Sequence, residues 1–302
     1  MKKRLTILIM IVSFSGGLRA GDAGVNGMAF LKLDVDARAA GMGGAFTAVA
    51  SDAGAAFWNP AGLAAADGSS LIVMHNQWLL DITQQFAAIN FKKDRHNFGV
   101  SVNLMTIPGI EIRGSVPNNE PDGNVDAVNI SAAVSYATAF FGDWLTGITV
   151  KYLYEEYYLY SAPGWAIDLG VQKREILSDL DLGITIRNIG RMSELDREAT
   201  ALPVILRNGF AYKLPVKIME RKPLITADIE HIIDESTYFR IGAEFDIKDY
   251  LSLRSGLMTG NNDTHFSAGI GVKYEKFRFD YAFVPYDYDL GNTHRLSLMI
   301  GF

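Results

Sequence analysis

The sequence of 302 residues contains no cysteine. This absence excludes disulfide bonds, thiolate nucleophiles and cysteine-ligated zinc, and it excludes a lipid anchor on an N-terminal cysteine. Beyond the first twenty residues the chain also lacks any run of about 18 apolar residues, the length that a membrane-spanning helix needs. We therefore expect no transmembrane helix in the mature protein.

An excess of basic charge is missing as well, since 28 lysines and arginines stand against 34 aspartates and glutamates. Nucleic-acid-binding proteins carry a basic patch or stripe, so this balance argues against nucleic acid as a partner. The five histidines form no H-E-x-x-H motif or paired metal spacing, and no G-x-S-x-G motif occurs. The sequence thus predicts a protein that is not an enzyme and that has no metal or other cofactor.

The first twenty residues read MKKRLTILIMIVSFSGGLRA. A basic start at Lys2, Lys3 and Arg4 precedes an apolar stretch of ten residues, and small residues lead to Ala20. This is the pattern of a secretory signal peptide, and the apolar stretch is too short to span a bilayer. We predict that residues 1–20 are removed on export.

From Ser70 onward, apolar residues recur at every second position, which is typical of strands with one apolar face. The opposite face is polar or bears glycine. Its charged members include Lys151, Asp168, Arg187, Arg207, Arg240, Glu244, Arg254, Lys273, Arg278, Asp280 and Arg295, and its glycines include Gly170, Gly183, Gly209, Gly242, Gly269 and Gly271. A soluble sandwich buries the apolar face, whereas a membrane barrel turns that face to lipid and its polar face to the lumen. Periodicity alone does not separate the two.

Three further features favour the membrane barrel. About fourteen strands are predicted, an even number that suits bacterial outer-membrane barrels; they begin near Ser70, Ile82, His96, Asn124, Thr146, Gly164, Leu180, Pro203, Pro223, Thr237, Leu251, Thr264, Phe277 and Thr293. Connections alternate between short turns and longer loops at 108–123, 155–163, 189–202 and 284–292, although 213–222 is long for a turn. The chain ends on an alternating strand that closes with Phe302, as outer-membrane proteins do. We expect both termini in the periplasm.

The stretch GMGGAFTAVASDAGAAFWNPAGL, residues 41–63, is rich in small residues. Between Ala37 and Ala66, 13 of 30 residues are alanine and 5 are glycine. The dinucleotide fingerprint does not fit, because a third glycine in register and a βαβ unit are lacking, and the large apolar residues argue against a linker. We predict two short helices, the first capped by Ser51 and ended before Pro60, packed closely as a plug inside the barrel. The predicted organisation is a hatch at 21–68 and a barrel at 69–302.

The segment RAAGMGGAFTAVASDAGAAFWNPAGLA resembles the N-terminal hatch of the FadL superfamily of outer-membrane barrels, and most closely its PorV/PorQ branch. The last 24 residues, FDYAFVPYDYDLGNTHRLSLMIGF, resemble the final hairpin of that branch. The resemblance implies a 14-stranded barrel in the outer membrane, closed by the hatch. It also implies that the hatch residues matter structurally or for gating, namely Gly41, Gly43, Gly44, Trp58, Asn59, Pro60, Ala61 and Gly62.

Three functions follow as hypotheses. A PorV/PorQ-type protein binds secreted cargo and a large translocon barrel in a type IX secretion system, through its outer loops. A FadL-like protein instead passes hydrophobic small molecules across the outer membrane through a hatch that moves. A secreted enzyme is the third. For the lumen we predict a network of salt bridges, within the wall and against the hatch, drawn from Lys151, Asp168, Arg187, Arg254, Arg278, Asp280 and Arg295, because buried charges need partners.

Overall fold

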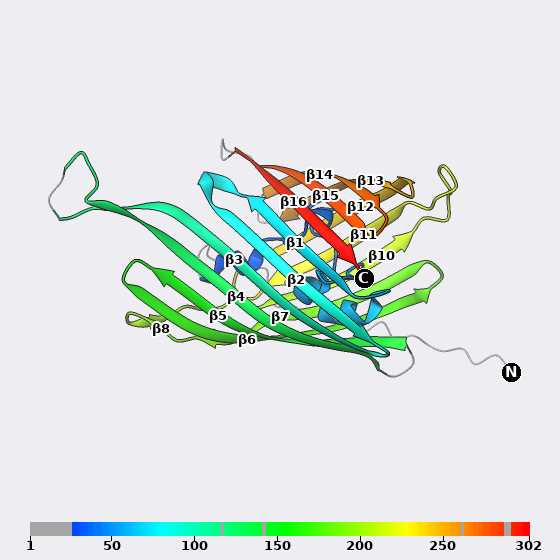
Figure 1. Ribbon diagram of the computed structural model, residues 1–302, viewed down its shortest axis with the longest axis horizontal. Coiled ribbons are helices and arrows are strands. Elements are labelled where there is room, and N and C mark those ends of the chain that lie inside the picture. The colour runs from blue at the N-terminus through cyan, green and yellow to red at the C-terminus, as the bar shows by residue number, and fades with distance from the viewer. Residues whose placement is uncertain (1–25, 116–117, 141–142, 261–262, 287–290) are drawn as a thin grey trace.

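The computed structural model describes residues 26–115, 118–140, 143–260, 263–286 and 291–302. Fourteen antiparallel strands form one closed barrel, in which the last strand pairs with the first (Figure 1). The strands are β1 (Ser70–Gln77), β2 (Thr83–Lys93), β3 (His96–Ile112), β4 (Gly123–Phe140), β5 (Trp144–Tyr157), β6 (Tyr160–Leu177), β7 (Leu180–Met192), β10 (Ile205–Lys213), β11 (Leu224–Ile232), β12 (Thr237–Lys248), β13 (Leu251–Gly260), β14 (Asp263–Tyr274), β15 (Phe277–Tyr286) and β16 (Gly291–Gly301). The predicted all-β barrel is confirmed.

The strand starts lie at or within four residues of the predicted positions, and one predicted loop is wrong. Residues 155–163 do not form a long loop, because β5 and β6 continue pairing to Tyr157 and Tyr160. The aromatic and β-branched residues there suit a pleated strand, so the hairpin extends to a tight turn. The connection after β7 does leave the barrel and contains a small hairpin, β8 (Glu194–Leu195) and β9 (Glu198–Ala199).

The outer face of the barrel is apolar and the inner face is polar. Large outward side chains are well exposed, such as Val134 at 59%, Phe266 at 64% and Leu296 at 58%. Inward positions one residue away hold buried polar groups, such as Ser135, Ser267 and Arg295. A soluble barrel would bury the apolar face, so this inversion shows that the outer surface is built to meet lipid.

The two ends of the barrel differ. At one end, here named the turn end, short connections at 94–95, 178–179, 249–250 and 275–276 lie with the C-terminal Phe302. Aspartates at positions 94 and 179 take the left-handed backbone conformation that tight turns require. At the other end, the loop end, β3 and β4 form a hairpin that extends far beyond β1 and β2 (Figure 1).

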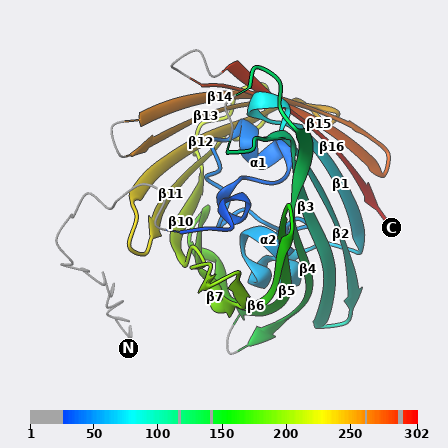
Figure 2. The same ribbon diagram turned by 90° about the vertical axis from the view of Figure 1, so that its left-hand side faces the viewer.

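Residues 26–66, here named the hatch, lie inside the barrel (Figure 2). Their helical pieces are short: η1 (Ala29–Lys32), α1 (Ala37–Gly41), α2 (Ala55–Trp58) and η2 (Pro60–Ala65). The break before Pro60 is confirmed. The predicted cap at Ser51 is wrong, because α2 begins at Ala55 after Gly54, and Asp52 rather than Ser51 accepts the backbone N–H of Gly54.

Across the residues that the structure describes, no helix is long and apolar enough to cross a membrane. The predicted signal peptide, residues 1–20, lies outside the described residues. The predicted boundary at residue 68 also stays a prediction, although the first strand begins at Ser70. The described part of the chain begins at the loop end, since the Asn26 side chain donates to the Ile233 carbonyl and to the Glu235 carboxylate in the connection between β11 and β12.

Candidate functional site

The centre of the hatch is an aromatic and amide cluster around Trp58 and Asn59. The Trp58 ring meets Phe46 and Phe57 edge to face, and its Nε1 donates to the carbonyl of Val35 at 3.2 Å. The Asn59 side chain caps η2 by accepting from Ala61 N, and its Nδ2 donates to the carbonyl of Val171 in β6 at 3.1 Å. Asn59 therefore orders the turn into Pro60 and ties it to the wall.

Glycines let the hatch backbone touch the wall. A Cβ built on Gly256 in β13 would lie 2.0 Å from the backbone nitrogen of Gly43, and one on Gly147 in β5 would lie 2.3 Å from Pro60. Within the hatch, a Cβ built on Gly62 would lie 2.2 Å from the carbonyl oxygen of Ala50. Gly43 and Gly44 also have positive φ. The wall glycines thus allow the hatch backbone to approach the strands closely, because a residue without a Cβ leaves space for it.

One set of ion pairs joins the hatch to the middle of the wall. Asp34 lies 3.0 Å from Arg240 and 3.7 Å from Arg207. Both arginines also pair with Glu230 of β11, and Arg207 stacks over the ring of Trp58 at 4.8 Å. The wall thereby presents two arginines and one carboxylate, and the hatch supplies the second carboxylate that balances them.

A second set lies nearer the turn end. Arg38 of the hatch forms a two-pronged bridge to Glu244, which also accepts from Arg254 at 2.6 Å. Arg254 continues to Asp280, and Asp280 to Arg278. Arg278 then returns to the hatch at Asp52, 3.0 Å away. Burial alone would lower the pKa of Arg38, but the Glu244 carboxylate outweighs it and raises that pKa above its ordinary value.

Asp36 is the buried acid of this region. Its side chain caps α1 by accepting from Arg38 N at 3.0 Å, while its other oxygen has no hydrogen-bond donor among the described residues. Burial raises the pKa of the Asp36 carboxyl to about 7, against the attraction of Arg278, 3.9 Å away, and with help from the carboxylates of Asp52 and Asp280. Near neutral pH this hatch residue is therefore poised between its charged and uncharged forms.

The predicted lumen residues divide into separate groups. Lys151 and Asp168 pair at 2.7 Å in the wall, and both bind Asn188, where β7 leaves its regular register. Arg254, Arg278 and Asp280 belong to the set described above. Arg187 contacts the hatch instead, donating to the Phe57 carbonyl at 3.1 Å and stacking on the Phe57 ring.

Among the described residues, Arg295 forms no ion pair with the other predicted lumen charges. It is buried in β16, and its Nε is unpaired within the part of the chain that the structure describes. Sequence reasoning also missed the hatch acids Asp34, Asp36 and Asp52 as partners. Their only signal was an acidic residue among small ones, which strand periodicity does not reveal.

An apolar cluster lies at the loop end of the lumen. Residues of η1 and its N-cap pack against inward-facing residues of β3, β5, β6, β7 and the β7–β10 connection; the buried members are Met28, Phe30, Leu31, Met105, Leu153, Ala166, Met192 and Leu202. We name these eight residues the apolar cluster. Here Met28, Phe30 and Leu31 of the hatch contact apolar wall residues, whereas nearer the turn end Arg38 and Asp52 of the hatch pair with charged wall residues.

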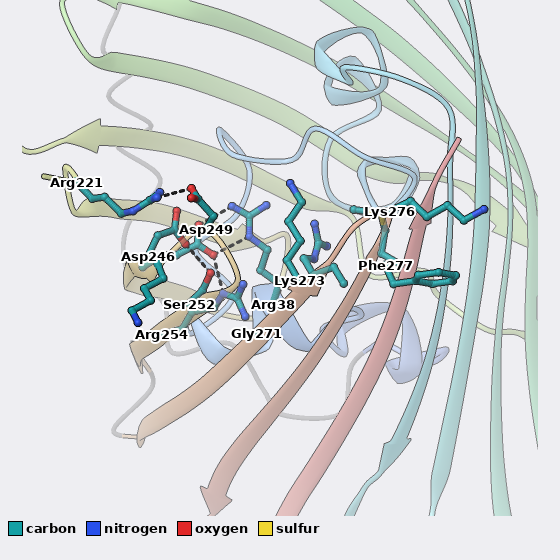
Figure 3. A pocket seen from close by; sticks show the side chains of 14 residues that line it. Arg38, Arg221, Asp246, Asp249, Ser252, Arg254, Gly271, Lys273, Lys276 and Phe277 are labelled. Carbon is teal, nitrogen blue, oxygen red and sulfur yellow. Dashed lines mark hydrogen bonds and ion pairs between the residues drawn. The ribbon is translucent and has the colours of Figure 1, made fainter. Parts of the chain in front are cut away.

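At the turn end the lumen opens into two charged cavities on either side of the Arg38–Glu244 bridge. The first has a volume of about 310 Å³ and the second about 270 Å³, and both touch Asp246. Figure 3 shows the first, with Arg38 from the hatch facing Lys273 and Arg254 from the wall. Among the described residues no group of three or more acids and histidines could hold a metal ion.

Hatch, wall and lumen together define a barrel closed by its own N-terminal segment. The model of a family described as an uncharacterised protein family (UPF0164) matches residues 20–166. No curated protein matches the chain. Among solved structures, the toluene transporter TodX of Pseudomonas putida is 12% identical with a TM-score of 0.69, covering 89% of this chain and 98% of that chain. The toluene transporter TbuX of Ralstonia pickettii has a TM-score of 0.66 at the same identity and coverage.

The monoaromatic hydrocarbon channel CymD is also similar, with a TM-score of 0.61, 11% identity, and coverage of 89% of this chain and 97% of that chain. At such identities the likeness establishes the fold alone. It agrees with the FadL-type architecture expected from the sequence. The finer assignment to the PorV/PorQ branch finds no support in these three structures and stays a prediction.

Proposed function

We propose that this protein is an outer-membrane channel through which small hydrophobic molecules cross, with residues 26–66 as a hatch that must move. The observation that carries the proposal is the apolar cluster at the loop end, where hatch residues such as Phe30 and Leu31 fill a lumen lined by Met105 and Leu153. Two of the similar solved structures are toluene transporters and a third is a monoaromatic hydrocarbon channel, which supports the same class of cargo.

The proposed orientation places the turn end in the periplasm and the loop end outside the cell. Short periplasmic turns and longer outer hairpins are usual in such barrels, and the predicted signal peptide supplies export. The C-terminal Phe302 is then periplasmic, as predicted. The first described residue, Asn26, lies at the outer end, so the periplasmic position predicted for the N-terminus gains no support.

In the proposed route, a hydrophobic molecule displaces η1 from the apolar cluster and binds in its place. A sideways exit is supported by the wall between β7 and β10, where backbone pairing ends at Arg187 and Ile205. Beyond that point β7 pairs only with β6, and the connection is tied to the hatch by the hydrogen bond from Gly27 N to Ala201 O. The charged cavities oppose passage of an apolar molecule straight to the turn end.

Uptake of labelled toluene tests this function. Cells lacking other hydrocarbon channels should accumulate toluene faster when they produce this protein than when they carry an empty vector. The test variant is Leu31→Asp, which places a carboxylate in the apolar cluster. It should reduce the increase in toluene uptake while the barrel still folds. No gain with wild-type protein that is present and folded in the outer membrane would refute uptake of this class.

The partner-binding function remains a second candidate because the two lumen cavities are charged rather than apolar. If the lumen admits no apolar ligand, the long β3–β4 hairpin at the loop end would be the surface that binds protein partners. If this candidate holds, deleting the gene displaces surface proteins without changing toluene uptake. The hydrocarbon-channel relatives support the first proposal over this one.

A further inference from the structure

We propose that the turn-end cavity between hatch and wall binds a small soluble anion carrying phosphate or carboxylate groups. The cavity has a volume of about 310 Å³, room for a compact molecule with several charged groups. It is formed by Arg38 of the hatch and Arg221 of the β10–β11 connection, together with β12, β13, β14, β15, β16 and their turns. This site is independent of the apolar route, which begins at the opposite end of the lumen.

The lining is rich in cations. Seven basic side chains contribute, Arg38, Arg221, Lys248, Arg254, Lys273, Lys276 and Arg278, against three acidic ones, Glu244, Asp246 and Asp249. Behind the lining, Asp280 and Asp52 neutralise part of this charge. The carboxylates are shared, because Glu244 serves two arginines and Asp280 serves two. Shared carboxylates leave guanidinium N–H groups able to bind another anion.

Lys273 provides a positive charge that no carboxylate of the described residues neutralises through an ion pair. It follows Gly271 on the inward face of β14, and its side chain is exposed and forms no ion pair among the described residues. Figure 3 shows it standing beside Arg38 over the cavity. Gly271 leaves room for Arg254 because it has no side chain; a Cβ at this position would lie 2.7 Å from the Arg254 guanidinium. The bare backbone lets Arg254 lie flat against the strand beneath the cavity.

A small anion fits this place better than a protein surface or a lipid. Arg38, Arg254 and Lys273 face one another across a concave space inside the lumen (Figure 3), and the lining strands present their lipid-facing residues on the other side. Because Arg38 belongs to the hatch and Lys273 to the wall, an anion held between them adds a bond between the two parts. Bound anion should therefore stabilise the closed position of the hatch.

The test uses full-length protein in a nonionic detergent, with pyrophosphate as the probe and calorimetry as the readout at fixed ionic strength. Wild-type protein should bind pyrophosphate, and Lys273→Gln should weaken binding about tenfold, the loss expected for one charge-assisted contact. The control is Lys93→Gln, which removes an exposed lysine at the turn end of β2, outside the cavity. It should leave the affinity unchanged.

Three results would overturn the proposal. The first is no heat of binding to folded wild-type protein. The second is equal weakening by both lysine variants, which would show general charge attraction rather than a site. The third is binding only after phosphatidylglycerol is added to the micelles, which would assign the cations to a lipid headgroup. Toluene uptake is a separate readout, so failure here leaves the channel proposal standing.

Discussion

At the scale of single residues, the lumen alternates between glycines that admit the hatch and charges that hold it. Gly256 accepts Gly43 against its bare Cα, while the neighbouring Arg254 pairs with Glu244, the partner of hatch residue Arg38. Neither type of residue would serve alone. Close approach brings backbone together without specificity, and ion pairs fix which hatch residue meets which strand.

Replacing Gly256 with valine should loosen the hatch. The new Cβ would overlap the backbone nitrogen of Gly43, 2.0 Å away, and overpacking of this kind costs about 1–3 kcal/mol. The matched control is Ser255→Val at the preceding residue of β13, which faces outward. The thermal unfolding temperature in detergent should fall for Gly256→Val and stay unchanged for Ser255→Val. Equal stability of both variants would show that the contact carries no weight.

Asp36 predicts how hatch stability depends on pH. Its carboxyl has a pKa of about 7 in the folded protein and 3.8 as its reference value. Between those pH values the folded state keeps a proton that the unfolded state loses, so stability falls as pH rises from about 4 to about 7 and is level above. At about 1.4 kcal/mol per pKa unit the fall is a few kcal/mol.

The unfolding temperature at pH 5 and pH 8 measures this effect. Asp36→Asn keeps a side chain that can cap α1 but cannot ionise, so it should reduce the drop between the two pH values. The ionisable side chains that act on the Asp36 carboxyl are those of Arg278, Asp52 and Asp280. An unchanged drop in Asp36→Asn would assign the pH dependence to another group.

At the scale of elements, the wall is uneven and one seam is incomplete. Strands β3 to β6 extend well past β1, and β7 loses its partner β10 beyond Arg187. The end of that seam is held by one buried group. Asp168 accepts from Asn188 N, Lys151 binds both residues, and Asn188 Nδ2 donates to the Pro203 carbonyl.

Removing Asp168 should destabilise this seam. Asp168→Ala leaves Lys151 buried without its carboxylate, a change that costs about 3–5 kcal/mol when one partner of a buried pair is lost. The double variant Asp168→Asn with Lys151→Met removes both charges and should recover most of that loss. Urea unfolding in detergent compares the two. If the single and double variants are equally stable, the ion pair does not hold the seam.

At the scale of the molecule, the sequence was sufficient for the barrel and for the position of the plug. Alternation from Ser70 to Phe302 is local and visible, and the Trp58-Asn59-Pro60 break has a steric cause. Residues 155–163 were misjudged because tyrosines and charges suit a hairpin above the membrane as well as a loop. The pairing of Asp34, Asp36 and Asp52 with wall arginines depends on contacts far apart in the chain, which no local pattern contains.

The central claim, that the hatch must move for hydrophobic molecules to cross, has a direct test. A Cβ on Gly27 would lie 3.5 Å from the Thr200 Cβ, within reach of a disulfide, and the chain has no other cysteine. Cells producing Gly27→Cys with Thr200→Cys should take up toluene only after reduction, and either single variant should ignore reductant. Equal uptake before and after reduction, with the bond shown to be complete, would contradict the account.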